Sequence, residues 1–363
     1  MSMKKKNPEN YIYLLAGLVF LTGIILLSYF SFQYFVRGRS PISLIVSQKL
    51  AEQPVGNIEC DYQRILDGVC VDSVDKINPE LVAVMIENHY EARPQAGLAS
   101  ASIVYEAPVE ANYTRFMAIY PVGDEVNKIG PVRSARPYYL DWLAEYGTPL
   151  YMHVGGSPDA LNIIKSRNIF DLNEFYRGWF YWRADGRSAP HNVYTSSKLW
   201  EKALLDYTED YEDNKYEGWS FVTTSPDHLT TLPPDHTVTD ITVSFLPPVY
   251  EAVWKYSSTT NKYGRYQMGE THVDDDGTNI LADNVIVQKV SAKVLDEVGR
   301  QEITTIGKGD LLVFKNGGVL EGYWEKSGAY ARTKFYYNNS NEIRLNPGKT
   351  WVEIVSQFNS VSY

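Results

Sequence analysis

The stretch "PELVAVMIENH", Pro79 to His89, decides how the fold of this chain is interpreted. Its centre, Leu81 to Ile86, is an uninterrupted apolar run, which is typical of a strand covered on both faces. Similar patterns downstream predict strands over 102–109, 114–121 and 149–154 and helices over 134–147, 157–168 and 196–207. Strands that alternate with helices predict a mixed α/β domain, which we place at 76–225.

The pattern changes after about Thr224. The segment "SPDHLTTLPPDHT" is rich in proline and polar residues and predicts a linker over 226–240. Short apolar runs separated by turns follow, and Asn316-Gly317 between two of them indicates a hairpin, because both residue types tolerate positive φ. We therefore predict an α+β fold in which a mostly β domain at 241–363 follows the mixed α/β domain.

The N-terminal part indicates a membrane anchor. The stretch from Tyr11 to Val36 carries no charged side chain, and as a helix it would be roughly 39 Å long. This exceeds the hydrocarbon core of about 30 Å, so the stretch is expected to span a membrane with some tilt. A cleavable signal peptide fits less well, because the run is long and no small-residue cleavage site follows it. We place a cytoplasmic tail at 1–10, a transmembrane helix at 11–36 and a stalk at 37–75.

The charge distribution sets the expected orientation and partners. Lys4, Lys5 and Lys6 precede the apolar stretch, whereas the chain beyond Arg39 is acidic and the formal net charge is −10. Loops rich in lysine and arginine stay in the cytoplasm, so we expect the body of the protein to lie outside it, attached to the plasma membrane by a single helix. The acidity also argues against nucleic acid as a partner.

Two cysteines support an exported body. Cys60 and Cys70 stand close together, which in an exported chain predicts a disulfide worth roughly 2–3 kcal/mol. The alternative is a pair of free thiols in a cytosolic domain. Their spacing is too wide for a C-x-x-C redox or zinc pair, and the six histidines lack the H-E-x-x-H pattern, so we expect no metal and no cofactor.

The acidic chain has one conspicuous basic motif, "IGPVRSARPYY". Ser134 is a good helix N-cap and Pro137 suits a first turn, so Arg133 and Arg136 are expected to flank the start of a helix. Backbone N–H groups and guanidinium forks at such a place bind carboxylate or phosphate. The alternative is that each arginine pairs with a carboxylate of its own domain.

Three further segments carry candidate polar groups. Gly155, Gly156 and Ser157 form a strand-to-helix turn that offers backbone donors or is simply tight. Glu106 and Glu110 share one side of a strand at a separation of roughly 13 Å, too far for a glycosidase pair at about 5–9.5 Å. Glu110 is instead expected to pair with Arg115 across a hairpin.

His191 and Asn192 stand in a predicted loop before a helix. The histidine suits general acid–base chemistry or ligand hydrogen bonding, although loop histidines are more often surface or capping groups.

Several long strings resemble one bacterial family. "ENHYEARPQAGL", "IGPVRSARP", "GGSPDAL" and "APHNVYTS" resemble the N-terminal domain of the YerB-like lipoproteins, and "THVDDDGTNILADNVIVQKV" resembles their C-terminal domain. The resemblance implies an exported, envelope-attached protein of two domains and implies no reaction. Where the family has a lipidated cysteine, this chain has the apolar stretch Tyr11–Val36. The polar motif positions of the family correspond to Glu106, Glu110, Arg115, Arg133, Ser134, Arg136, Gly155, Gly156, Ser157, His191 and Asn192.

Three functional hypotheses follow. The first is a membrane-anchored extracytoplasmic protein that binds an anionic or glycan ligand of the cell envelope through the polar positions named above. The second is an envelope hydrolase or transferase in which Glu106 or Glu110 and His191 supply acid–base groups. The third is a structural or assembly module that docks partner proteins through its β domain.

Overall fold

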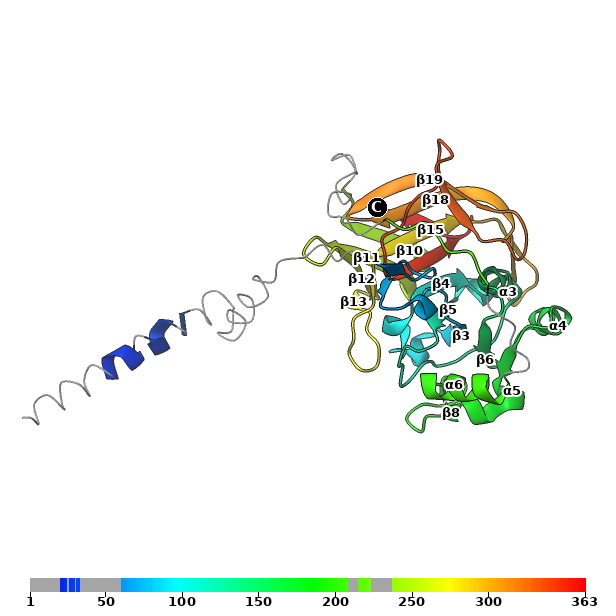
Figure 1. The fold of residues 1–363 in the computed structure, drawn as a ribbon, viewed down its shortest axis with the longest axis horizontal. Coiled ribbons are helices and arrows are strands. Elements are labelled where there is room, and N and C mark those ends of the chain that lie inside the picture. The colour runs from blue at the N-terminus through cyan, green and yellow to red at the C-terminus, as the bar shows by residue number, and fades with distance from the viewer. Residues whose placement is uncertain (1–19, 25, 30, 33–59, 208–214, 223–236) are drawn as a thin grey trace, which may run out of the picture. The chain divides into compact units, whose positions relative to one another are not determined.

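The computed structural model describes residues 20–24, 26–29, 31–32, 60–207, 215–222 and 237–363 (Figure 1). The chain divides into two compact units, Met1–Ile58 and Glu59–Tyr363. In the first unit the described residues 20–24, 26–29 and 31–32 are helical. The remainder of the predicted tail, of the transmembrane helix and of the stalk up to residue 59 lies outside the described residues. No helix among the described residues is both long and apolar enough to cross a membrane.

A ten-stranded sheet organises the second unit, in the order β20-β19-β18-β15-β21-β4-β5-β3-β6-β7. Its strands are β3 (Leu81–Glu87), β4 (Ile103–Pro108), β5 (Thr114–Pro121), β6 (Leu150–His153), β7 (Asp171–Asn173), β15 (Asn284–Lys289), β18 (Gly307–Lys315), β19 (Gly318–Lys326), β20 (Lys334–Tyr337) and β21 (Thr350–Val355). Parallel pairing of β21 with β4 joins the two halves of the chain in this sheet. The predicted α/β and β segments therefore both contribute to one sheet, as the adjoining cyan and orange-to-red strands in Figure 1 show. The predicted linker lies largely outside the described residues.

The central strands are buried on both faces. Every residue of β3, β4 and β5 is buried, as predicted for Leu81–Ile86. Val82, Val84 and Ile86 pack in one apolar cluster, and the alternate residues of the same strand pack in another. This alternation is the period of two that a pleated strand imposes.

Different elements cover the two faces. A second, six-stranded sheet and the helix α6 (Ser197–Asp206) supply Trp254 and Trp200 to the cluster that contains Val84. The strands of this second sheet are β10 (Asp240–Leu246), β11 (Tyr250–Ser257), β12 (Lys262–Gln267), β13 (Glu270–Thr271), β14 (Leu281–Ala282) and β22 (Ser360–Ser362). The helices α3 (Pro137–Leu143) and α4 (Pro158–Ser166) contribute Trp142 and Ile164 to the other cluster.

The remaining elements are short. The helix α5 spans Glu174–Arg177, and the small strands are β1 (Tyr62–Gln63), β2 (Cys70–Val71), β8 (Trp182–Arg183), β9 (Val193–Tyr194), β16 (Ala292–Val294) and β17 (Gln301–Ile303). The 3₁₀ turns are Val74–Lys76, Tyr90–Ala92, Leu98–Ser100, Glu110–Asn112, Ala144–Tyr146 and Gly178–Phe180.

Two local predictions are confirmed. Asn316 and Gly317 have φ angles of 54° and 71° and close the hairpin between β18 and β19, as the Asn-Gly pair requires. Cys60 and Cys70 form a disulfide with a Cα–Cα distance of 5.6 Å. The cystine segment belongs to the compact unit, because Leu66 is 1% exposed and Asp67 accepts a hydrogen bond from Ser102 Oγ at 2.6 Å. The segment predicted as a stalk is thus folded from Cys60 onward.

The predicted start of α3 is wrong. Ser134 does not cap the helix, which begins at Pro137 with Arg136 as its N-cap at φ −134° and ψ 150°. The residue before a proline is disfavoured in the helical region, which keeps Arg136 extended. Upstream, the backbone runs as an extended segment, because Arg133 N donates to Met85 O and Ala135 N donates to Gly155 O.

Candidate functional site

A carboxylate at the end of β3 joins an arginine and a histidine from distant segments. Arg133 Nε donates to Glu87 Oε1 at 2.9 Å, and His191 Nδ1 lies 2.7 Å from Glu87 Oε2. Backbone bonds hold these segments side by side, since Glu87 N donates to Pro131 O and Val132 N donates to Val193 O. Backbone hydrogen bonds therefore bring the side chains of Arg133 and His191 close to Glu87. We call Glu87, His89, Glu91, Arg133 and His191 the Glu87 cluster.

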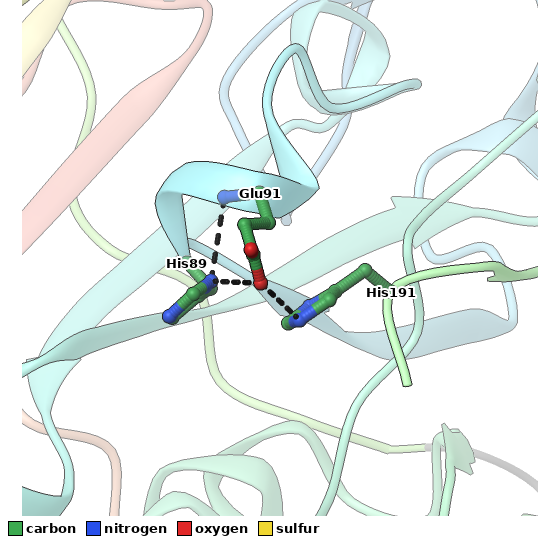
Figure 2. Close-up of side chains that lie close together, drawn as sticks. All are labelled: His89, Glu91 and His191. Atoms are coloured by element: carbon green, nitrogen blue, oxygen red, sulfur yellow. Dashed lines mark hydrogen bonds and ion pairs between the residues drawn. The ribbon is translucent and has the colours of Figure 1, made fainter. Parts of the chain in front are cut away.

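His89 and Glu91 complete this cluster (Figure 2). The rings of His89 and His191 stack with centroids 4.8 Å apart at 13°. Glu91 Oε2 lies 3.2 Å from His191 Nε2 and 3.7 Å from His89 Nδ1. Burial, and after it the charge of His191, lowers the pKa of His89. The side chain of Glu91 is 55% exposed, so the cluster is open to solvent on one side.

A second ion pair lies nearby. Arg136 Nε donates to Glu110 Oε1 at 2.7 Å. Burial alone would raise the pKa of Glu110, but the charges of Arg136 and Arg115 outweigh it and the pKa is lowered. Glu110 thus pairs with Arg136 and not with Arg115 as predicted. The reason is that the chain leaves β4 at Pro108 and enters a 3₁₀ turn at Glu110, which carries this carboxylate toward the start of α3.

Arg115 is the most buried of the three arginines. Its Nη1 donates to Ser134 O at 2.7 Å, and its Nε is buried without a hydrogen-bond partner among the described residues. Burial first, and then repulsion from Arg136 and Arg133, lowers the pKa of Arg115 to about 10. The Arg133 and Arg136 guanidinium groups therefore lie close enough to repel that of Arg115. We call Arg115, Arg133 and Arg136 the arginine group.

The glycine turn supports the arginine group but does not offer the expected donors. Gly155 N donates to Asn173 Oδ1 at 3.0 Å, and Ser157 N donates to Ala135 O at 3.3 Å. Gly156 forms a parallel bridge with Ala135, and Ser157 Oγ caps α4. The prediction that this turn presents free N–H groups is therefore wrong for Gly155 and Ser157. The turn instead fixes the backbone between Arg133 and Arg136.

Asn192 forms hydrogen bonds with the preceding segment and, among the described residues, none with the arginine group. Its Oδ1 accepts a hydrogen bond from Arg183 Nη1 at 3.0 Å, and its carbonyl accepts one from Ala184 N.

Three aromatic side chains that precede Arg183 in the chain are exposed to solvent. The exposed fractions of Phe175, Tyr176 and Trp179 are 67%, 78% and 57%. Phe175 lies against the glycine turn, because a Cβ added at Gly155 would be 2.6 Å from its ring.

Glu106 lies apart from the site, in the interior. It is 1% exposed and accepts hydrogen bonds from Arg265 Nη2 at 2.6 Å and from Thr114 Oγ1 at 2.7 Å. Arg265, on β12, is completely buried, and its Nη1 donates to His272 Nδ1 at 2.8 Å. Glu353, on β21, is in register with Glu106. We call Glu106, Arg265, His272 and Glu353 the interior network.

Protonation in the interior network follows from burial. Burial, and then the neighbouring Glu106, raises the pKa of Glu353 well above its usual range. Burial, and then the charge of Arg265, lowers the pKa of His272 well below its usual range. Burial thus favours the neutral forms of Glu353 and His272, while Arg265 and Glu106 form the salt bridge of the network at 2.6 Å.

Sequence reasoning missed Glu87, His89 and Glu91. The spacing Glu-x-His at 87–89 was a usable signal, because alternate residues of an extended chain share a side. Glu91 follows in the 3₁₀ turn Tyr90–Ala92. Its partner His191 comes from a remote loop, so no short motif contains the complete set. As a result, the carboxylates that contact His191 are those of Glu87 and Glu91, and not those of Glu106 or Glu110.

Comparisons with known proteins identify the family. Residues 67–210 match the N-terminal domain, and residues 241–352 the C-terminal domain, of a protein family of unknown function, DUF3048. The chain is 30% identical over 286 residues to "Putative lipoprotein YerB" of Bacillus subtilis (strain 168), covering 77% of this chain and 82% of the relative. The crystal structure of the YerB protein from Bacillus subtilis is similar with a TM-score of 0.71 at 28% identity, covering 84% of this chain and 100% of that one. The chain belongs to the DUF3048 family, as the resemblance implied.

Proposed function

We propose that this DUF3048 protein is an envelope-attached, extracytoplasmic protein that binds an anionic glycan ligand at the arginine group. Three observations support the location. Its relative is named as a lipoprotein, the stretch Tyr11–Val36 suits a membrane anchor, and a disulfide fits an oxidising compartment. In this proposal the N-terminal helix crosses the plasma membrane once and the Glu59–Tyr363 unit lies outside the cytoplasm.

The charge balance of the arginine group carries the ligand proposal. Within the described residues, the salt bridges of this group involve Glu87 and Glu110, while Arg115 donates to a backbone carbonyl. Three guanidinium groups thus stand against two carboxylates. Arg133 and Arg136 retain 26% and 15% side-chain exposure, so both side chains are partly accessible to solvent. A ligand carboxylate or phosphate would offset the repulsion that these two arginines exert on Arg115 and would gain charge-assisted hydrogen bonds.

The exposed aromatic side chains favour a sugar-containing anion over a simple ion. Phe175 lies on the glycine turn, and that turn is bonded to Ala135, which stands between Arg133 and Arg136 in the chain. Aromatic rings present flat apolar faces that carry substantial contact area. A ligand that combines a ring with an anionic group can meet both features at once, as an acidic cell-wall glycan does.

A hydrolase or transferase is the second candidate function. The contact of 2.7 Å between His191 Nδ1 and Glu87 Oε2 favours it, because a carboxylate that orients a histidine is a recurring acid–base arrangement. The acid–base pair would be Glu87 and His191, in place of the glutamates that the sequence suggested.

The binding proposal is tested with the Arg133→Ala/Arg136→Ala double variant. The full chain is sedimented with purified, insoluble cell-wall glycan, and the bound fraction is measured against ligand concentration. We expect the apparent affinity to fall by at least about tenfold, which corresponds to roughly 1.4 kcal/mol, while the melting temperature changes little.

Arg167→Ala is the matched control. Arg167 pairs with Asp141 at 2.8 Å and is 24% exposed, close to the values for Arg133, but it is not part of the arginine group. It should bind like the unaltered chain. Unchanged binding by the double variant, or an equal loss in the control, would refute the proposal.

A further inference from the structure

We propose that His89, Glu91 and His191 form a zinc-binding site that Glu87 orients. This inference rests on the Glu87 cluster alone and does not require the anionic ligand. Two imidazoles and one carboxylate are a donor set that zinc uses where it keeps one coordination position open. Calcium and magnesium prefer sets made of oxygen atoms alone.

The contact between Glu87 and His191 prepares the histidine for a metal. With Nδ1 as the donor to Glu87 Oε2 at 2.7 Å, the neutral ring carries its lone pair on Nε2. That atom faces Glu91 Oε2 at 3.2 Å. Arg133 in turn holds the other oxygen of Glu87 at 2.9 Å. A carboxylate that fixes the tautomer and orientation of a ligating histidine is the usual outer-shell partner of a protein metal site.

His89 presents the correct nitrogen as well. Its Nδ1 accepts a hydrogen bond from Glu91 N at 3.3 Å, which places the lone pair on Nδ1 and the ring proton on Nε2. This Nδ1 lies 3.7 Å from Glu91 Oε2. In this tautomer each of the three residues offers one ligand atom, and these atoms lie within 4.8 Å of one another (Figure 2).

The distances fit a tetrahedral ion after one rotation. The three donor atoms lie within 4.8 Å of one another, and bonds of about 2.0–2.1 Å require donor separations of roughly 3.3–3.4 Å. The separations of 3.2 and 3.7 Å to Glu91 are already near this value. Two rings stacked at 13° cannot both aim their lone pairs at one point, so the His89 ring must turn about its side-chain bonds. Its 22% exposure leaves room for this turn.

Isothermal titration of the chelator-treated full chain with zinc chloride tests the site. We expect one zinc ion per chain at the cluster and no heat of binding with magnesium or calcium chloride. Co²⁺ should give the intense visible absorption of a four-coordinate site. Glu91→Gln keeps the side-chain size at an exposed position, so it should fold normally and lose at least about tenfold in zinc affinity. His191→Ala and His89→Ala should lose the site and the Co²⁺ spectrum.

Glu87→Gln separates positioning from ligation. Because Glu87 does not touch the ion, this variant should retain the stoichiometry and the Co²⁺ spectrum while the zinc affinity falls by about 10- to 100-fold. Glu174→Gln, a carboxylate paired with Arg183 outside the cluster, serves as the control and should bind zinc normally.

The proposal is overturned if zinc produces no heat, or if Glu91→Gln and both histidine variants bind zinc as the unaltered chain does. The second result would assign any binding to other groups. Failure here leaves cell-wall binding by the arginine group untouched, and the sedimentation assay on chelator-treated protein measures that separately.

Discussion

Glu87 and Asn88 are neighbours on the chain, yet they serve polar clusters in opposite environments. Glu87 binds Arg133 and His191 beside solvent. Asn88 points inward, where its Nδ2 donates to Glu106 Oε1 at 3.2 Å within the interior network. The two clusters contain the same residue types, namely glutamate, arginine and histidine. They differ in solvent exposure, because 26% of the Arg133 side chain is exposed to solvent whereas the Arg265 side chain is completely buried.

Because of this difference in exposure, the interior network can serve only to hold the fold together, whereas the Glu87 cluster is a candidate binding site. The Arg265 guanidinium donates to Glu106 and His272 and lies 5.1 Å from the centre of the Trp351 ring. A ligand cannot reach it, and the pair joins strands β4 and β12 from the two halves of the chain. In the Glu87 cluster, Glu91 and part of Arg133 remain in contact with water. The ligand proposed above would be able to reach these ion pairs and replace one of their partners.

The largest loss of stability is expected when the salt bridge between Arg265 and Glu106 is broken. Arg265→Met leaves the Glu106 carboxylate buried without its countercharge, and such a loss costs about 3–5 kcal/mol. The free energy of unfolding, measured with urea, should fall by that amount, and the loss should persist at high salt because the pair is shielded from solvent.

A double variant sharpens this test. Adding Glu106→Leu to Arg265→Met removes the unpaired charge together with its partner, so part of the lost stability should return. A cost below about 1 kcal/mol for Arg265→Met alone would show that the interior network is not the scaffold described above.

The sequence predicted the local elements well, because their signals are local. The buried run Leu81–Ile86 identified β3, and Asn316-Gly317 identified a hairpin. Arg133, Arg136 and His191 were chosen for their chemistry, and backbone pairing of Val132 with Val193 brings their segments together. The sequence could not reveal which face of a strand a second sheet would cover.

Glu106 illustrates this limit. Its side of β4 is polar in the pattern, but β12 delivers Arg265 onto that side from 159 residues away. The same limit applies to the Glu87 cluster, where His191 reaches Glu87 across 104 residues. Long-range pairing decides both environments, and a single sequence contains no signal for it.

A second prediction concerns protonation in the interior network. Burial and Glu106 raise the pKa of Glu353 well above the value of 4.5 expected in the unfolded chain. The folded protein therefore holds this proton more tightly, and its stability should decrease as the pH rises from about 4.5 through the folded pKa. Glu353→Gln removes this dependence, so the stability of the variant relative to the unaltered chain should improve with pH by at most about 1.4 kcal/mol per unit.

Urea unfolding at about pH 5 and about pH 8 measures this effect. Glu325→Gln, an exposed carboxylate beside Lys308, is the control and should show no such trend. A constant difference between Glu353→Gln and the unaltered chain at both pH values would mean that Glu353 is ionised in the fold.

The smallest change in the free energy of unfolding is expected for a variant of the arginine group. A small change there would support a role of these arginines in binding a ligand. The side chain of Glu110 is 25% exposed even with Arg136 in place, so in Arg136→Ala water can solvate the freed carboxylate. Partly exposed ion pairs contribute about 0–1 kcal/mol, and salt screens them. The free energy of unfolding should therefore fall by no more than about 1 kcal/mol, and less at high salt. A loss comparable to that of Arg265→Met would mean that the Arg136 guanidinium is committed to holding the fold, and a cation committed in that way is not free to bind a ligand.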